Sequence, residues 1–124
     1  MEPMSSPPAA TDPPEPFAST WVVIPLFNEG TMIPGVVGDL LPRFPHVVCV
    51  DDGSTDGSAD AAAAAGATVI LHPVNLGQGA ALQTGIEFAL RHADCRYIVT
   101  FAADGQHRVE DAVAMLGRAA RGGL

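Results

Sequence analysis

The stretch from Val47 to Gly57 constrains the fold of this chain more than any other. It begins with Val47-Val48-Cys49-Val50, an uncharged, mostly β-branched run of the kind that forms strands buried on both faces of a parallel sheet. Asp51 and Asp52 follow at once, and the next residues can turn the chain into a helix. Such a turn places both carboxylates at the carboxyl edge of a sheet, where open α/β sheets bind ligands. The alternative is that these acids only solvate a loop and cap the next helix.

The rest of the chain repeats this strand and helix pattern. Predicted strands span residues 21–24, 47–50, 67–71 and 96–101, and the first of them is stopped by Pro25. Predicted helices span residues 29–41, 58–65, 80–91 and 109–121, and Gly66 closes the second. In the third helix, Leu82, Ile86 and Leu90 recur at four-residue spacing, with Phe88 and Ala89 alongside, which predicts its core face. Strands that alternate with helices through short connections predict an α/β fold with a mostly parallel sheet.

Composition excludes several other classes of protein. Residues 1–19 are rich in Pro, Ser and Ala and predict a disordered or extended leader, followed by one domain over residues 20–124. A formal net charge of −8, with few Lys and Arg, argues against nucleic acid as a partner. No apolar run reaches the roughly 18 residues of a membrane span, and no basic segment begins a secretory signal. Cys49 and Cys95 lack metal-site spacing and predict reduced thiols of a cytosolic protein.

Polar loops connect each predicted strand to the predicted helix that follows it. They are Phe27-Asn28-Glu29, Asp51-Asp52-Gly53-Ser54, Asn75-Leu76-Gly77-Gln78-Gly79 and Asp104-Gly105-Gln106-His107. Because the carboxyl ends of parallel strands lie at one edge, we expect these loops to converge on one rim. Carboxylate and amide oxygens suit Mg²⁺ or Mn²⁺, and glycines and helix N-termini suit phosphate. The sequence therefore predicts a rim that binds a diphosphate through a divalent cation.

Four motifs follow one another along the chain: WVVIPLFNE (21–29), VCVDDGSTDG (48–57), NLGQGAA (75–81) and DGQH (104–107). In this order they resemble family 2 glycosyltransferases of the GT-A fold, in particular bacterial polyprenyl-phosphate sugar synthases and other relatives of dolichyl-phosphate mannose synthase. The resemblance implies a Rossmann-like, nucleotide-sugar-binding half of a GT-A enzyme. It implies metal-dependent transfer of a sugar from a nucleotide-sugar donor to a polyprenyl phosphate acceptor, in cell envelope biosynthesis. The expected location is cytoplasmic, at the inner face of the membrane, with peripheral membrane contact through a C-terminal part or a partner protein.

The resemblance also implies roles for single residues. Those that would bind the nucleotide-sugar are Pro25, Phe27, Glu29, Asp51, Asp52 and Gly77. Asp52, with Asp51 beside it, would accept a hydrogen bond from the base or hold the adjacent loop. Asp104 and Gln106 would coordinate the cation and, through it, the diphosphate, and Asp104 is the implied catalytic residue.

Simpler roles stay open for several of these positions. Phe27 could be a loop aromatic that covers the sheet end, and Glu29 could be an acid that interacts with a helix macrodipole. Ser54 and Asp56 are predicted to cap the following helix. His72 and His107 are expected to be solvated or hydrogen-bonded loop residues without a catalytic role.

The chain departs from the family pattern in three places. Ala102 stands where the motif Asp-x-Asp-Gly-Gln-His has its first Asp, and Gln78 stands where a basic residue is common. The sequence also ends at Leu124, before the acceptor-binding part that such enzymes carry. The alternative function is a catalytically incomplete nucleotide-binding module or fragment. A nucleotidyltransferase or a nicotinamide-binding domain fits less well, because no Gly-rich loop follows the first strand.

Overall fold

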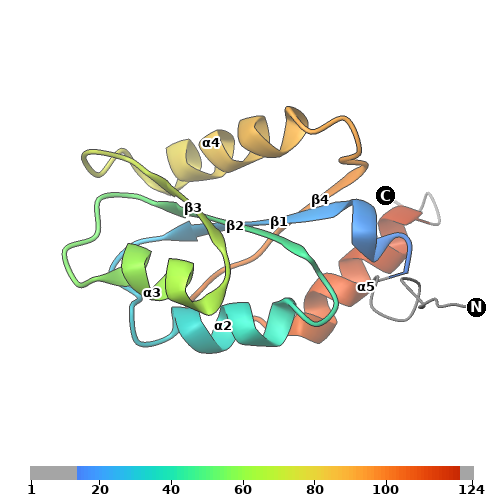
Figure 1. Cartoon of the computed structure of the whole chain (residues 1–124), viewed down its shortest axis with the longest axis horizontal. Coiled ribbons are helices and arrows are strands. Elements are labelled where there is room, and N and C mark those ends of the chain that lie inside the picture. Colours follow the sequence, from blue (N-terminus) through green and yellow to red (C-terminus); the bar gives the residue numbers. More distant parts are fainter. Residues whose placement is uncertain (1–13, 121–124) are drawn as a thin grey trace, which may run out of the picture.

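The computed structural model describes residues 14–120 as a parallel sheet with helices on both faces (Figure 1). In chain order the elements are η1 (Phe17–Ser19), β1 (Thr20–Leu26), α2 (Ile33–Leu40), β2 (His46–Asp51), α3 (Ser58–Ala65), β3 (Thr68–Leu71), α4 (Gln78–Leu90), β4 (Tyr97–Thr100) and α5 (Val109–Ala120). The strand order is β3-β2-β1-β4, and each neighbouring pair is parallel. The predicted α/β fold is therefore confirmed.

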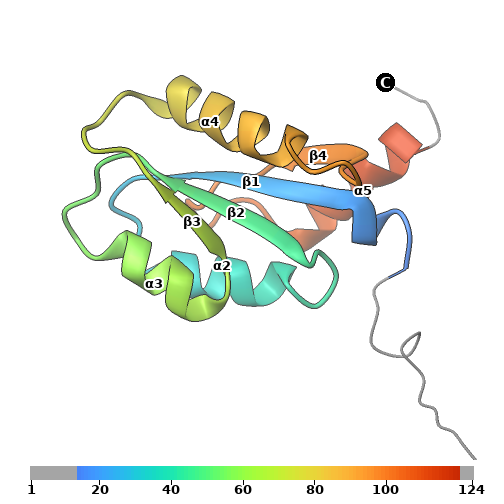
Figure 2. The same ribbon diagram turned by 45° about the horizontal axis from the view of Figure 1, so that its top comes forward.

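The direction of the strand order reverses between β1 and β4. α2 and α3 lead the chain from β1 through β2 to β3, whereas α4 returns it to the other side of β1. Figures 1 and 2 show α4 over one face of the sheet and α2, α3 and α5 over the opposite face. Open parallel sheets bind ligands at the carboxyl ends of the strands where the order reverses. The fold thus places the loops after β1 and β4 where a ligand is expected.

β1 is longer than predicted and continues through Pro25. Proline lacks the N–H that a strand donates to its neighbour, which is why the sequence predicts an earlier end. The carbonyl of Val23 accepts from the N–H of Phe101, so Val23 and, two residues later, Pro25 face the β4 side. β4 ends at Thr100, the partner of Val23, so position 25 has no strand beside it on that side. Pro25 therefore removes no hydrogen bond from the sheet.

α2 begins at Ile33, four residues after the predicted start at residue 29. Asn28 has a φ of 52°, and the N–H of Gly30 donates to Asp56 Oδ2, so the residues before the helix are held by a neighbouring loop. α3 and its closure at Gly66, with a φ of 111°, are as predicted. The other elements lie close to their predicted ranges.

Residues 1–13 and 121–124 lie outside the described part of the chain, so the predicted leader and the end of the last predicted helix fall largely there. The described end of the leader is not extended, because Phe17–Ser19 forms a short 3-10 turn. Phe17 packs edge-on against Phe44, with 5.2 Å between the ring centroids. The boundary between leader and domain stays a prediction.

The core face of α4 is only partly the predicted one. The buried residues are Ala81, Gly85 and Ala89, so the prediction is confirmed for Ala89, whereas Leu82, Ile86 and Leu90, each one position after a buried residue, are not buried. Leu90 is 64% exposed. Small residues are buried because α4 lies very close to β1: a Cβ added at Gly85 would stand 2.3 Å from Val23 Cγ1. The spacing of apolar residues takes no account of side-chain size. Here the size of the side chains decides which face of the helix packs against the sheet.

Candidate functional site

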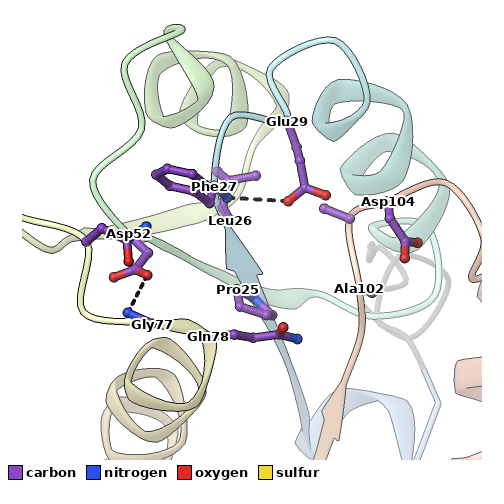
Figure 3. A pocket seen from close by; sticks show the side chains of 11 residues that line it. Pro25, Leu26, Phe27, Glu29, Asp52, Gly77, Gln78, Ala102 and Asp104 are labelled. Atoms are coloured by element: carbon purple, nitrogen blue, oxygen red, sulfur yellow. Dashed lines mark hydrogen bonds between the residues drawn. The ribbon is translucent and has the colours of Figure 1, made fainter.

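A cavity of about 290 Å³ opens at the carboxyl edge of the sheet, between the ends of β1 and β4 (Figure 3). It is lined by Pro25, Leu26, Phe27, Glu29, Asp52, Asn75, Gly77, Gln78, Ala102, Ala103 and Asp104. Figure 3 shows Asp52 on one side, Glu29 and Asp104 on the other, and Phe27 between them. The structure thus brings residues from all of the predicted polar loops to one cavity.

Two of the predicted site residues, Asp51 and Gln106, do not line this cavity. Asp51 ends β2 and is buried on the same face of the strand as Cys49, which packs against α2 and α3. Burial and the nearby Asp51 carboxylate raise the pKa of Cys49 to about 12. Asp51 Oδ2 accepts from the N–H of Ser54 at 3.2 Å, and Oδ1 has no partner in the described part of the chain. Asp51 therefore binds the turn that follows β2 and does not line the cavity.

The loop after β1 is bound to the loop after β2 by hydrogen bonds between backbone and side chains. The donor and acceptor pairs are Asn28 N to Ser54 Oγ (2.9 Å), Glu29 N to Ser58 Oγ (2.9 Å), Gly30 N to Asp56 Oδ2 (3.0 Å) and Thr55 N to Asn28 Oδ1 (2.9 Å). The predicted helix cap is therefore wrong for Ser54, whose hydroxyl serves the other loop. Asp56 does bind the first N–H of α3, that of Ser58, at 3.0 Å. Hydrogen bonds from Ser58 and Gly30 hold the pKa of Asp56 below its usual range.

Glu29 belongs to the cavity rather than to a helix. α2 starts at Ile33 and has no acid in its first turn, so the alternative role of Glu29 beside the helix macrodipole is wrong. Glu29 Oε1 accepts from the backbone N–H of Phe27 at 3.3 Å (Figure 3), which holds the carboxylate beside the Phe27 backbone, while the ring points to the side of Asp52. Phe27 is 45% exposed and so presents its ring to the cavity and to solvent.

Asp52 is the most constrained acid of the site. Its Oδ1 accepts from the N–H of Leu76 at 2.8 Å and from His72 Nδ1 at 2.9 Å, and its Oδ2 accepts from the N–H of Gly77 at 2.8 Å. Burial raises the pKa of Asp52, but the hydrogen bonds from His72, Leu76 and Gly77 outweigh it and hold that pKa below its usual range. Asp52 therefore holds the loop that leads into α4, which is one of its two predicted roles.

Asp104 lies in an exposed loop after β4, and its side chain is 48% exposed. Its Oδ1 accepts from the N–H of Gln106 at 2.9 Å and lies 3.7 Å from His107 Nδ1. Gly105 has a φ of 82°, and a Cβ there would stand 2.2 Å from the methyl carbon of Met32, so this loop rests directly on the start of α2. Gln106 is exposed, and only its backbone is bound to Asp104.

The donor set fits a cation that is shared with a substrate. Within residues 14–120, no three His, Cys, Asp or Glu side chains gather closely enough to hold a metal ion. Mg²⁺ in proteins is often held by one or two carboxylates together with phosphate oxygens of the substrate. Asp104 can supply one such carboxylate at the cavity, and Ala102 supplies none.

Some residues of the cavity were not predicted from the sequence. Leu26 and Ala103 line it although neither was predicted, and Asn75 lines it as part of a predicted polar loop without an assigned role; all three lie within or next to the recognised motifs. His72 was expected to be a hydrogen-bonded loop residue, which is confirmed, but its partner Asp52 was not foreseen. None of the helices in the described part of the chain is long and apolar enough to cross a membrane.

Comparisons with known proteins identify the family of the chain. The model of the family "Glycosyl transferase family 2" matches residues 21–124. An uncharacterized protein of Methanocaldococcus jannaschii is 42% identical over 92 residues, which are 73% of this chain and 37% of that protein. The polyprenol monophosphomannose synthase of Mycolicibacterium smegmatis is 35% identical over 109 residues, which cover 82% of this chain and 41% of that enzyme.

A solved structure, the crystal structure of a mycobacterial protein, aligns with a TM-score of 0.56 at 27% identity and covers 69% of this chain and 31% of that one. The chain thus spans less than half the length of these relatives. Fold, motifs and family match lead to the same assignment, with the expected GT-A type of fold. The chain belongs to glycosyl transferase family 2, a family of enzymes.

Proposed function

We propose that this chain is the nucleotide-sugar-binding part of an enzyme that transfers a sugar from a nucleoside diphosphate to a polyprenyl phosphate at the inner face of the membrane. The family match supports the transferase class, and the similarity to polyprenol monophosphomannose synthase supports the lipid phosphate acceptor. One observation carries the proposal: the cavity between β1 and β4 joins an aromatic ring, three carboxylates and the start of α4 around one space.

The base of the donor would bind between Phe27 and Asp52. Phe27 offers a ring face on which a base can stack. A carboxylate has about four acceptor positions, and the protein occupies two on Oδ1 and one on Oδ2 of Asp52. The remaining position can accept one imide N–H, a group that uracil and guanine both carry. Glu29 and Pro25 line the same space, where the ribose would lie.

The diphosphate would bind between the start of α4 and Asp104. α4 has no side-chain cap at its N-terminus, so its first N–H groups have no partner within the helix. Gly77 and Gln78 line the cavity at this point, and helix N-termini attract phosphate. Asp104, with Gln106 as a further proposed ligand, would hold a Mg²⁺ or Mn²⁺ ion. The bound cation would neutralise charge on the departing nucleoside diphosphate.

The transfer requires no general base from this chain. A lipid phosphate is already anionic near neutral pH, so its oxygen can attack the anomeric carbon directly. The barrier lies in the departure of the diphosphate, which the N–H groups at the start of α4 and a cation held by Asp104 would stabilise. This separates the proposal from glycoside hydrolysis, in which two carboxylates act as a pair.

Titration calorimetry with UDP and with GDP, each with and without Mn²⁺, tests the proposal. We expect weak binding of one of them that depends on Mn²⁺, and we expect Asp104→Ala to remove the effect of Mn²⁺ because the cavity then loses its carboxylate ligand. Asp60→Asn, an exposed acid in the first turn of α3, is the matched control and should behave as the wild type. Absence of binding to either nucleotide, or an unchanged Mn²⁺ effect in Asp104→Ala, would refute this assignment.

Restoring the missing acid should strengthen the same site. Ala102 is half-buried, lies beyond the end of β4 and lines the cavity with Asp104. Divalent-ion affinity rises with ligand number and charge, so Ala102→Asp should raise Mn²⁺-dependent nucleotide affinity about tenfold. Adding Asp104→Ala should erase the gain. If Ala102→Asp instead lowers the melting temperature and leaves Mn²⁺ affinity unchanged, the new carboxylate is merely desolvated and the metal site is wrongly placed.

A further inference from the structure

A partly buried histidine connects Asp52 to α4. His72 follows β3 directly, and its side chain is 9% exposed. Its Nδ1 lies 2.9 Å from Asp52 Oδ1, and its Nε2 lies 2.8 Å from Thr84 Oγ1, in the middle of α4. The imidazole thus spans from the acid at the end of β2 to the helix on the upper face of the sheet in Figure 1.

The partners determine which nitrogen of His72 carries the proton. The pKa of Asp52 lies below its usual range, so near neutral pH its carboxylate only accepts hydrogen bonds. Nδ1 must therefore donate to Asp52, and in the neutral ring Nε2 must accept. The hydroxyl of Thr84 can supply that donor at 2.8 Å. Each hydrogen bond thus supports the other, and the ring has one orientation that satisfies both neighbours.

Asp52 transmits this constraint to the loop before α4. Its two oxygens accept from the N–H groups of Leu76 and Gly77 at 2.8 Å. Leu76 is 57% exposed, and Gly77 has a φ of 102°. Without a fixed carboxylate, a loop of this kind samples several conformations. Gly77 lines the cavity, so its position sets the geometry of the nucleotide site.

We propose that His72 is a positioning residue of this enzyme: held by Thr84, it orients Asp52 so that the Leu76–Gly77 backbone is fixed in the conformation that receives the donor nucleotide. His72 does not line the cavity and acts only through Asp52. That the loop receives a nucleotide rests on the function proposed above. The orientation of Asp52 and the order of the loop do not depend on that function, so both can be measured without any ligand.

The tautomer of His72 in the ligand-free protein is the first test. Nitrogen-15 NMR of the imidazole should show Nδ1 protonated and Nε2 unprotonated, the opposite of the form that a free histidine prefers. Thr84→Val keeps the shape of the side chain but removes the hydroxyl, and it should shift the ring away from this tautomer. A ring of the wild-type protein with Nε2 protonated and Nδ1 unprotonated at neutral pH would overturn the proposal, whether or not any variant folds.

Loop order and affinity form the second test. His72→Phe keeps a planar ring but binds neither neighbour, and we expect amide hydrogen exchange at Leu76 and Gly77 to accelerate at least about tenfold, with a similar loss of UDP affinity. His72→Asn can still donate to Asp52 and should recover most of both, which a purely structural role would not explain. His46→Asn is the matched control, because His46 stacks on Trp21 at the opposite end of the strands.

The outcomes separate this inference from the proposed function. If the wild type binds no nucleotide while His72→Phe still accelerates exchange at Leu76 and Gly77, the donor site is wrong and the positioning of the loop stands. If exchange and affinity are unchanged in His72→Phe, or if His72→Asn is as impaired as His72→Phe, the positioning role is wrong.

Discussion

Gly53→Ala is expected to disable the proposed nucleotide site and to destabilise the fold. Gly53 has a φ of 84°, and a Cβ there would stand 2.8 Å from the backbone nitrogen of Asn75 and 2.9 Å from the backbone carbonyl carbon of Val74. Backbone atoms cannot rotate away as the end of a side chain can, so the loop before α4 must move. Asp52, the neighbouring residue, then loses its alignment with the N–H groups of Leu76 and Gly77.

Two costs add in this variant. The left-handed backbone costs about 1 kcal/mol for alanine, and the overpacking costs about 1–3 kcal/mol more. For a domain of this size, the melting temperature should fall by roughly 10–20 °C. Affinity for UDP with Mn²⁺ should fall at least about tenfold, because the hydrogen bonds to the Asp52 carboxylate are disrupted.

Gly57→Ala is the matched control. Gly57 has nearly the same φ, 82°, but a Cβ there meets nothing within 4 Å. It should therefore show only the conformational cost of about 1 kcal/mol, with unchanged nucleotide affinity. Thermal unfolding and calorimetry on both variants make the comparison. Equal losses of stability and affinity in the two variants would show that the close contact of position 53 with Val74 and Asn75 does not contribute to the effect.

The fold was largely predictable because its signals are local. Continuous β-branched runs such as Val47–Val50 mark buried parallel strands wherever they occur, and Gly66 ends α3 through its own backbone freedom. The polar loops were predictable as a group, since parallel strands must end at one edge. The convergence of Phe27, Asp52 and Asp104 on one cavity follows from this topology.

The features of the site that could not be predicted from the sequence depend on distances between helices, strands and loops. Asp51 and Asp52 are adjacent and chemically identical, and only the alternation of the strand sends one toward α2 and α3 and the other toward the cavity. The partnership of His72 with Asp52 joins residues that are twenty positions apart. The hydroxyl of Ser54 was predicted to cap the following helix, but it accepts a hydrogen bond from the N–H of Asn28, in the loop after β1.

The close contact between α4 and β1 is the clearest feature of this kind, and Gly85→Ala tests how much it contributes to stability. Alanine is favoured over glycine in a helix by about 1 kcal/mol, so the helix alone would gain stability. Here the new Cβ would stand 2.3 Å from Val23 Cγ1 and 3.2 Å from Val50 Cγ2, both fully buried valines. Because a β-branched side chain in a packed core has little freedom to rotate, α4 must shift away from the sheet. Overpacking costs about 1–3 kcal/mol, which exceeds the helix gain, so we expect a net loss of up to about 2 kcal/mol in the free energy of unfolding.

A double-mutant cycle with Val23→Ala decides whether the clash is the cause. Val23→Ala alone should destabilise the protein by leaving a cavity, yet in the presence of Gly85→Ala the new methyl group can occupy part of that space. The two losses should then be less than additive by more than about 1 kcal/mol in urea unfolding. Gly38→Ala is the control: this α2 position has nothing within 4 Å of an added Cβ, so the same substitution should stabilise the protein by up to about 1 kcal/mol. Additive losses in the cycle, or a stabilised Gly85→Ala, would mean that α4 does not depend on a glycine to reach β1.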